Sequence, residues 1–335
     1  MNTADLVAAA LFAGVVAYGL FGGADFGSGF YDLTAGDARK GAAIRTLIDR
    51  SIGPVWEANH VWLIFVLVMW WTAFPGTFAA AMQTLFIPFL LALAGIVLRG
   101  ASFAFRKYAE TLSQAQLFGA LFATSSVITP FFLGTVAGAV ASGRVPGDGV
   151  GDRLTSWTGP VSLIGGAIAV GTCAFLAGVF LTADAQRAGE AALAQTLRVR
   201  TLIVGLVTGA VVLLALVPIR EDAPTLSDGL SGRAAPLVAV SAAAETATLV
   251  LLLRRRYAVA RVTAVVAVAA VLLGWGVAQY PWILVDQVTI DEAAGARATL
   301  TALLVAVVLA VVLVVPPLAY LYRFTQTEPS STEEA

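Results

Sequence analysis

The stretch WEANHVWLI at residues 56–64 decides the fold, because it opens a long apolar segment with an acid, an amide, the chain's single histidine and two tryptophans. From Ala58 to Leu98 no residue carries a fixed charge. At ~1.5 Å rise per residue, these positions would form a helix of about 60 Å, twice the ~30 Å hydrocarbon thickness of a bilayer. The segment must therefore turn once. We expect the turn at FPG (residues 74–76), because proline ends a helix and glycine permits a tight return.

The composition of the whole chain is that of a protein solvated by lipid. Of its 335 residues, 59% are hydrophobic and only 12% are charged, and a soluble domain could not bury so much apolar surface. A net charge of −1 provides no basic field for nucleic acid, and the single Cys173 excludes an internal disulfide or a cysteine metal cluster. The first ten residues contain Asp5 and no positive charge, so we expect a retained span rather than a cleaved signal.

Nine apolar runs are long enough to cross the bilayer, and they predict an all-α, polytopic membrane protein with about nine transmembrane helices. These runs are Leu6 to Phe30, the pair flanking residues 74–76, and the runs bounded by 110–144, 153–184, 200–220, 234–253, 261–286 and 297–323. We expect them to form a single transmembrane domain over residues 1–325. The polar, acidic tail at 326–335 is predicted to be disordered and cytoplasmic.

The distribution of basic residues predicts how the chain is oriented. Twenty lysines and arginines occur in all, and most lie in connections after odd-numbered spans or in the C-terminal tail. The other face holds only five: Arg144, Arg153, Arg220, Arg233 and Arg297. Because positive charge is retained in the cytoplasm, we expect the N-terminus outside and the C-terminus in the cytoplasm.

One cytoplasmic connection, residues 35–50, has the pattern of an amphipathic helix. Ile44, Leu47 and Ile48 recur at helical spacing, opposite basic residues. A helix of this kind binds at a membrane interface through its apolar side. We therefore expect an interfacial helix on the cytoplasmic membrane surface.

Three ionisable residues fall in the cytoplasmic half of the predicted membrane domain. Asp25 comes late in span one, Glu57 early in span two, and Arg99 at the inner end of span three. An ionised carboxylate inside a bilayer costs at least ~2.5 kcal/mol, so it should be paired, protonated or in contact with water. Arg99 is the natural partner for these acids.

His60 lies one helical turn from Glu57 and Trp56 on the same predicted face. We take Trp56 and Asn59, with Arg99, as supporting or ion-pairing residues. A structural interpretation stays open for each titratable group, since Glu57 could merely complement the positive end of its helix and His60 could be an ordinary core histidine.

The run GGADFGSG at residues 22–29 lies in a membrane helix, without the preceding strand or the lysine of a nucleotide loop. We expect its glycines to let another helix approach closely around Asp25. Glu245 lies in the middle of span seven, and the sequence assigns it no partner.

These motifs together resemble subunit II of the cytochrome bd quinol oxidases. The resemblance is carried by ADFGSG (24–29), by WEANHVWLI (56–64), and by Leu98 and Arg99 followed by Phe103 and Arg106. GVFLT (178–182) and TIDEAA (289–294) match more loosely. The resemblance extends over nearly the whole chain and is most specific in residues 20–110.

The resemblance implies a multi-pass subunit of a complex in the bacterial cytoplasmic (cell) membrane. The complex oxidises quinol and reduces dioxygen to water, and it is electrogenic without pumping. Haem b and haem d would be carried by a partner, subunit I, with a small single-span subunit in some members. This chain would bind no haem and no metal and would support assembly of subunit I. In some members of the family, subunit II also holds a structural quinone.

The resemblance also implies a role in proton uptake from the cytoplasm. By position, Glu57 matches the acid of the family's motif, Asp25 the acid of span one and Arg99 the arginine of span three. Titratable groups that lead inward are needed for such uptake. Glu57, Asp25 and His60 are therefore the candidate proton uptake path.

Two other functions remain alternatives. A proton- or sodium-coupled secondary transporter would use intramembrane acids, with Glu245 near mid-membrane as the competing site. A scaffold that only stabilises a catalytic partner would make every acid structural. The best acid cluster lies toward one face, and the strongest helix break falls in a turn, which favours the oxidase subunit over the transporter.

Overall fold

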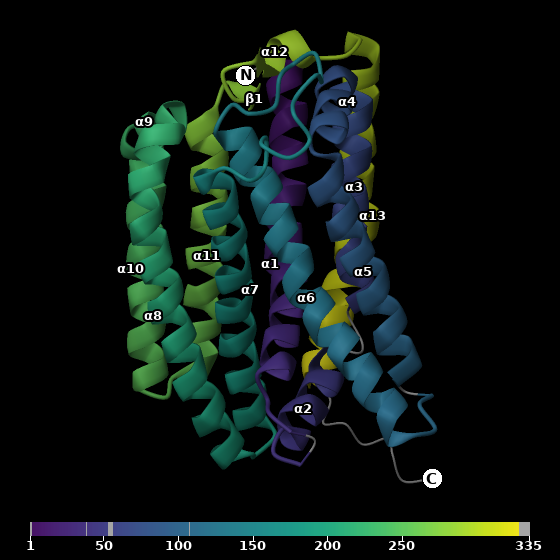
Figure 1. The fold of residues 1–335 in the computed structure, drawn as a ribbon, viewed down its shortest axis with the longest axis vertical. Coiled ribbons are helices and arrows are strands. Elements are labelled where there is room, and N and C mark those ends of the chain that lie inside the picture. Colours follow the sequence, from purple (N-terminus) through teal and green to yellow (C-terminus); the bar gives the residue numbers. More distant parts are fainter. Residues whose placement is uncertain (1, 38, 53–55, 107, 328–335) are drawn as a thin grey trace.

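The bundle is built around α1 (Thr3–Leu33), a helix of 31 residues. It starts at a capping box, in which the Asn2 side chain accepts a hydrogen bond from the Asp5 N–H and the Asp5 carboxylate accepts one from the Asn2 N–H. The computed structural model describes residues 2–37, 39–52, 56–106 and 108–327. In the view of Figure 1, α1 lies in the middle of the molecule, and it contacts several of the other long helices.

The remaining elements are helices apart from one short hairpin. In chain order they are α2 (Ala42–Ile52), α3 (Trp56–Ala73), α4 (Pro75–Thr84), α5 (Phe86–Arg106), α6 (Leu112–Ala141), α7 (Pro160–Arg187), α8 (Ala191–Asp222), α9 (Pro224–Ser231), α10 (Ala235–Leu253), α11 (Tyr257–Gln279), β1 (Trp282–Leu284), β2 (Val288–Thr289), α12 (Ile290–Ala293) and α13 (Arg297–Thr327). The two strands pair antiparallel.

Eight helices in the described part of the chain are long and apolar enough to cross a membrane. A ninth span is reached if α2 and α3, which meet at an angle of 59°, are counted as one bent span. The prediction of an all-α protein with about nine transmembrane helices is confirmed. The start of α1 and the end of α13 lie at opposite ends of the bundle (Figure 1), as an odd number of spans requires.

Close packing around α1 depends on its glycines. A Cβ atom added to Gly27 would overlap the backbone carbonyl of Cys173 on α7, and one added to Gly29 would overlap Ser126 on α6. The small residues therefore let two neighbouring helices lie directly against α1. Asp25 precedes both contacts on the same helix and is itself buried.

The connection between the second and third spans differs from the single turn predicted at residues 74–76. The chain does break at Phe74, but Pro75 then occupies the first turn of a further helix, α4, where its missing N–H is not needed. A second break at Leu85 precedes α5. Ala80, Ala81 and Leu85 are buried in a cluster with residues of α6, which keeps α4 on the bundle.

The predicted interfacial helix packs differently from the prediction. α2 forms within the expected region, but Ile44, Leu47 and Ile48 are buried in a protein cluster that includes Tyr31 and Phe122. Its apolar side therefore contacts the bundle rather than lipid. At the other end of the chain, α13 includes residues 326 and 327 of the predicted tail, and residues 328–335 lie outside the described residues.

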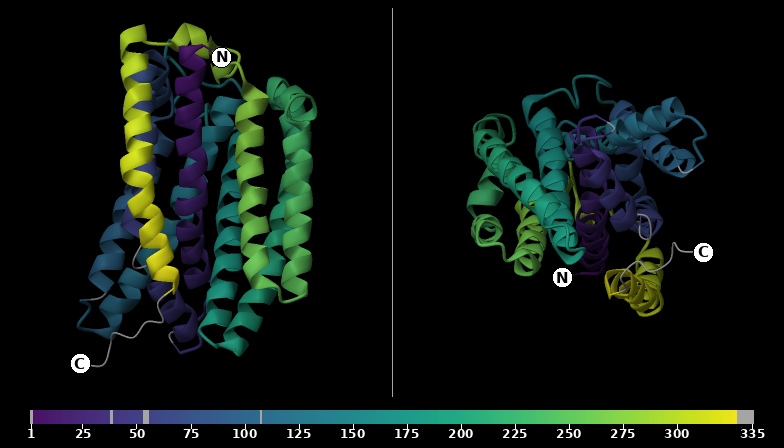
Figure 2. Two further views of the ribbon diagram at one scale, coloured as in Figure 1. Left: turned by 180° about the vertical axis from the view of Figure 1, so that it is seen from behind. Right: turned by 90° about the horizontal axis from the view of Figure 1, so that it is seen from below.

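The helix α13 lies at the edge of the bundle, beside α1 and α3 (Figure 2). Only 6% of its most apolar 18-residue window is buried, against 39% for α6 and for α7. Most of its surface is thus available to lipid or to another protein.

Candidate functional site

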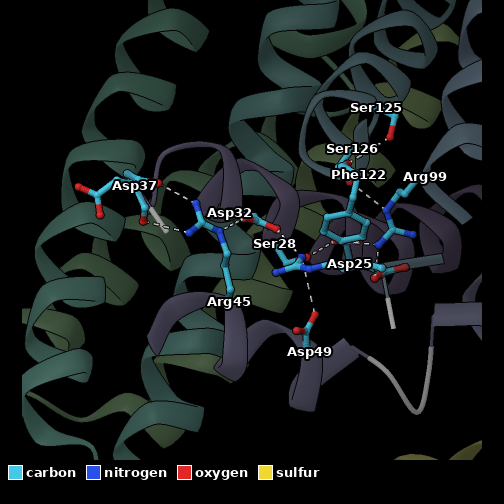
Figure 3. Close-up of polar contacts among 12 residues, drawn as sticks. Asp25, Ser28, Asp32, Asp37, Arg45, Asp49, Arg99, Phe122, Ser125 and Ser126 are labelled. Atoms are coloured by element: carbon cyan, nitrogen blue, oxygen red, sulfur yellow. Dashed lines mark hydrogen bonds and ion pairs between the residues drawn. The ribbon is translucent and has the colours of Figure 1, made fainter. Parts of the chain in front are cut away.

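Asp25 of α1 and Arg99 of α5 form an ion pair inside the bundle. Arg99 Nη2 lies 2.6 Å from Asp25 Oδ1, and the two side chains are 1% and 3% exposed. Arg99 Nε donates a hydrogen bond of 3.0 Å to Ser126 Oγ on α6. The structure thus brings together the acid and the arginine that the sequence paired, and it adds a third helix through Ser126 (Figure 3).

Aromatic rings enclose the Arg99 guanidinium on two sides. Its Cζ lies 5.0 Å from the centre of the Phe26 ring and 5.1 Å from that of Phe122. Ring faces attract a cation and exclude water. The arginine is therefore positioned by charge, hydrogen bonding and packing together, and removing its carboxylate partner would leave a buried charge uncompensated.

Three buried polar atoms near this ion pair have no hydrogen-bond partner among the described residues: Asp25 Oδ2, His60 Nδ1 and the Tyr18 hydroxyl. The His60 ring lies 6.3 Å from the Tyr18 ring and 6.1 Å from the Phe26 ring. Buried polar atoms usually find a partner, ordered water included. These atoms form a polar island beside the ion pair. Tyr18 was not identified from the sequence as one of its members, because a tyrosine in an apolar span carries no charge that marks it.

Glu57 lies elsewhere, on the outward face of α3. It is exposed, and the exposed apolar side chains Val61, Ile64, Val68 and Trp71 follow it at alternating intervals of four and three residues. These five residues, here called the α3 stripe, share one side of the helix. The expectation that Glu57 also converges on Arg99 is wrong, because Asp25 alone forms the ion pair with Arg99 in the described part of the chain.

The other two supporting residues predicted on α3, Trp56 and Asn59, face the interior of the bundle. Trp56 packs against Phe103 of α5, with ring centres 5.6 Å apart, and its ring also lies 6.3 Å from His60. Asn59 is only 2% exposed. Trp56 and Asn59 thus support the inner side of α3, whereas Glu57 stands on its outer side.

A second charged hub, which the sequence interpretation missed, lies two helical turns after Asp25. The buried Asp32 accepts a hydrogen bond of 2.7 Å from Arg45 Nε of α2 and one of 3.0 Å from Arg106 Nη1 of α5. Asp49 of α2 lies 3.9 Å from the same Arg106 nitrogen. The spacing of seven residues places Asp32 on the Asp25 face of α1, and this signal could have found it. The hub ties α1, α2 and α5 together (Figure 3).

Glu245 is separate from both charged clusters. It is half-buried in α10, and a Cβ on Gly209 of α8 would lie 3.5 Å from its Oε1. No ion pair of Glu245 occurs among the described residues. Within the same residues, no group of three or more His, Cys, Asp and Glu side chains could hold a metal ion.

Comparisons with known proteins agree on one family. A family model for cytochrome bd terminal oxidase subunit II matches residues 3–325. Subunit 2 of the cytochrome bd ubiquinol oxidase of Bacillus subtilis (strain 168) is 32% identical over 117 residues, which cover 32% of this chain and 35% of that protein. Subunit 2 of the cytochrome bd-I ubiquinol oxidase of Escherichia coli (strain K12) is 27% identical over 129 residues, 38% of this chain and 33% of that protein.

These two alignments each span about a third of the relative, whereas the similarity in structure extends over whole chains. A chain in the structure of the bd oxidase from Geobacillus thermodenitrificans superposes with a TM-score of 0.82 and 25% sequence identity. The match covers 97% of this chain and 98% of that one.

Proposed function

The chain belongs to the cytochrome bd terminal oxidase subunit II family, and from this we propose that it is the haem-free subunit of a bacterial quinol oxidase that reduces dioxygen to water. In this proposal, the redox chemistry takes place in a partner, subunit I, which carries haem b and haem d. This chain supports assembly of that partner and takes part in proton uptake from the cytoplasm. The complex lies in the cytoplasmic membrane, with the N-terminus of this chain outside.

The observation that carries the proposal is the position of Glu57 on the α3 stripe. The four apolar side chains of the stripe suit lipid, but an acid on the same face is costly to place there. A protein partner with a polar or hydrated surface at this point removes the cost. The low burial of α13, which packs beside α3, supports a docking face for subunit I on this side of the bundle.

The residues of the site that lie inside the bundle support proton uptake. His60 lies one turn from Glu57 along α3, and its ring is beside Phe26, the residue after Asp25. Oxygen reduction consumes protons at the haem, and quinol oxidation releases protons on the outer side. Uptake from the cytoplasm therefore makes the reaction electrogenic without a pump. Glu57, His60 and Asp25 are the titratable groups that would carry these protons.

The polar island extends this path. A water molecule bound between Asp25 Oδ2, His60 Nδ1 and the Tyr18 hydroxyl would satisfy three buried atoms at once. Asp25 Oδ1 accepts a hydrogen bond from Arg99, and its second oxygen remains able to accept one from water. We assign Tyr18 to this path as a positioning residue.

The proposal is tested by purifying the complex through an affinity tag on this chain and recording a reduced-minus-oxidised absorption spectrum. We expect haem b and haem d to co-purify with the tagged chain. The chain expressed without its partner should fold without haem, since its one histidine and three methionines offer no adequate set of axial ligands. A complex that contains no haem would favour the transporter, and stoichiometric haem on the isolated chain would overturn the division of roles.

A further inference from the structure

The turn between α10 and α11 consists of three consecutive exposed arginines, Arg254, Arg255 and Arg256. Arg255 adopts a φ of +57°, in the left-handed region. Its N–H donates to the Leu252 carbonyl at 3.1 Å, so the residue caps the end of α10. Glycine is the usual residue at such a position, because a side chain there is strained. An arginine that occupies a strained position points to a function for its side chain.

A fourth arginine reaches the same turn from α8. Arg198 Nη1 donates a hydrogen bond of 3.3 Å to the carbonyl of Leu253, the last residue of α10. Its Nε is buried and has no acceptor among the described residues. The Arg198 guanidinium thus retains donors for an additional oxygen ligand.

Two acids near the end of α7 and the start of α8 are engaged with other partners. Asp184 contacts Arg187 and Arg261, and Glu190 contacts Arg50. None of the four arginines at the α10–α11 turn forms an ion pair within the described part of the chain. The turn therefore presents a concentrated positive charge without an internal counterion.

Apolar side chains continue directly from the arginines toward the middle of the membrane. Leu253 and Val250 of α10 are exposed, as are Val199 and Ile203 of α8. Charged groups next to an exposed apolar surface match the two parts of a phospholipid: the arginines match the headgroup, and the apolar surface matches the acyl chains. Figure 1 places this turn at the same end of the bundle as α2.

We propose that Arg254, Arg255, Arg256 and Arg198 bind the headgroup phosphate of an anionic phospholipid, whose acyl chains pack along α8 and α10. Guanidinium groups donate paired hydrogen bonds to phosphate oxygens. Basic pockets between membrane helices recognise anionic headgroups. The inference stands independently of the proposed oxidase function, since it depends on the arginines and the adjacent apolar surface alone.

The test uses the purified complex in a neutral detergent, stripped of lipid and titrated with phosphatidylglycerol. Bound lipid is counted by native mass spectrometry. Arg255→Gly relieves the backbone strain and removes one positive charge, so we expect phosphatidylglycerol to bind about fivefold more weakly while the melting temperature stays equal or rises. The triple variant R254Q/R255Q/R256Q should lose the site. Arg153→Gln, an exposed arginine of the opposite face, should have no effect.

Three results would overturn the proposal. They are equal binding of phosphatidylglycerol by the wild type and the triple variant, equal binding of phosphatidylcholine and phosphatidylglycerol by the wild type, and complete displacement of the lipid by millimolar inorganic phosphate. The last result would mean that the arginines bind a free anion rather than a lipid.

Discussion

At the scale of single residues, the ion pair of Asp25 and Arg99 is the most constrained feature of the site. Both side chains are almost completely buried, so each charge depends on the other for compensation. A buried pair of this kind contributes little net stability, but breaking it is costly because the remaining ion stays without a counterion. We therefore expect the pair to specify how α1, α5 and α6 fit together more than it stabilises them.

This asymmetry leads to a prediction for Asp25. Asp25→Asn should destabilise the chain by about 3–5 kcal/mol, because Arg99 would be left buried and uncompensated. Membranes should then contain little assembled haem. The double variant Asp25→Ala with Arg99→Met removes both charges and should recover part of the haem content. Assembly of both variants is measured as haem per milligram of membrane protein. A haem content in the double variant that is no higher than in Asp25→Asn would contradict this interpretation of the pair.

A second prediction at this scale concerns Tyr18. Its hydroxyl is buried without a partner in the described chain, so Tyr18→Phe should leave assembly intact or slightly improve it. If the hydroxyl orders water beside Asp25 and His60, quinol-driven oxygen uptake per haem should fall severalfold and its pH profile should shift. Unchanged uptake and an unchanged profile would remove Tyr18 from the path.

At the scale of elements, α3 combines a protein-facing side and an outward-facing side. Asn59 and Met69 are buried, and the α3 stripe is exposed on the opposite side. The helix is apolar on nearly all faces, so the sequence carries no periodic pattern that separates lipid, core and partner. For this reason the sequence identified Glu57 as special but assigned it to the wrong side of the helix.

The α3 stripe can be tested by adding bulk at its centre. Ile64→Trp should block docking of subunit I, because a packed protein interface does not accept the larger ring. Leu213→Trp on α8 is the matched control, since Leu213 is exposed to a similar extent, 68% against 61% for Ile64, and lipid accommodates tryptophan. Pull-down through a tag on this chain should recover haem with the control variant only. Equal recovery of haem with both variants would place the partner elsewhere.

At the scale of the whole molecule, bilayer thickness and the cost of buried charge made most of the fold predictable. Apolar runs of sufficient length predicted the spans, and an acid and an arginine in the same half of the membrane predicted the central pair. The packing of α2 was not predictable, because Ile44, Leu47 and Ile48 suit a lipid interface and a protein groove equally well. Asp32 was missed although its spacing from Asp25 indicated a shared face.

The orientation of the molecule gives a further prediction. A reporter fused to a chain truncated after Arg256 should behave as cytoplasmic, and a reporter in the loop at residues 142–158 should behave as external, because most basic residues lie on the side of Arg256. Activity of alkaline phosphatase, which requires export, distinguishes the two fusions. The opposite pattern would reverse the side from which protons are taken up.

Glu57→Gln tests the central claim, that this chain helps to deliver protons to the oxidase, most directly. The amide preserves the size of the side chain but carries no proton, and Glu57 is not part of the Arg99 ion pair, so the haem spectrum should stay nearly intact. Quinol-driven oxygen uptake per haem should fall, whereas Glu57→Asp, which keeps a titratable group, should retain more activity. Normal uptake by the Gln variant would contradict the account, and so would loss of haem from its membranes.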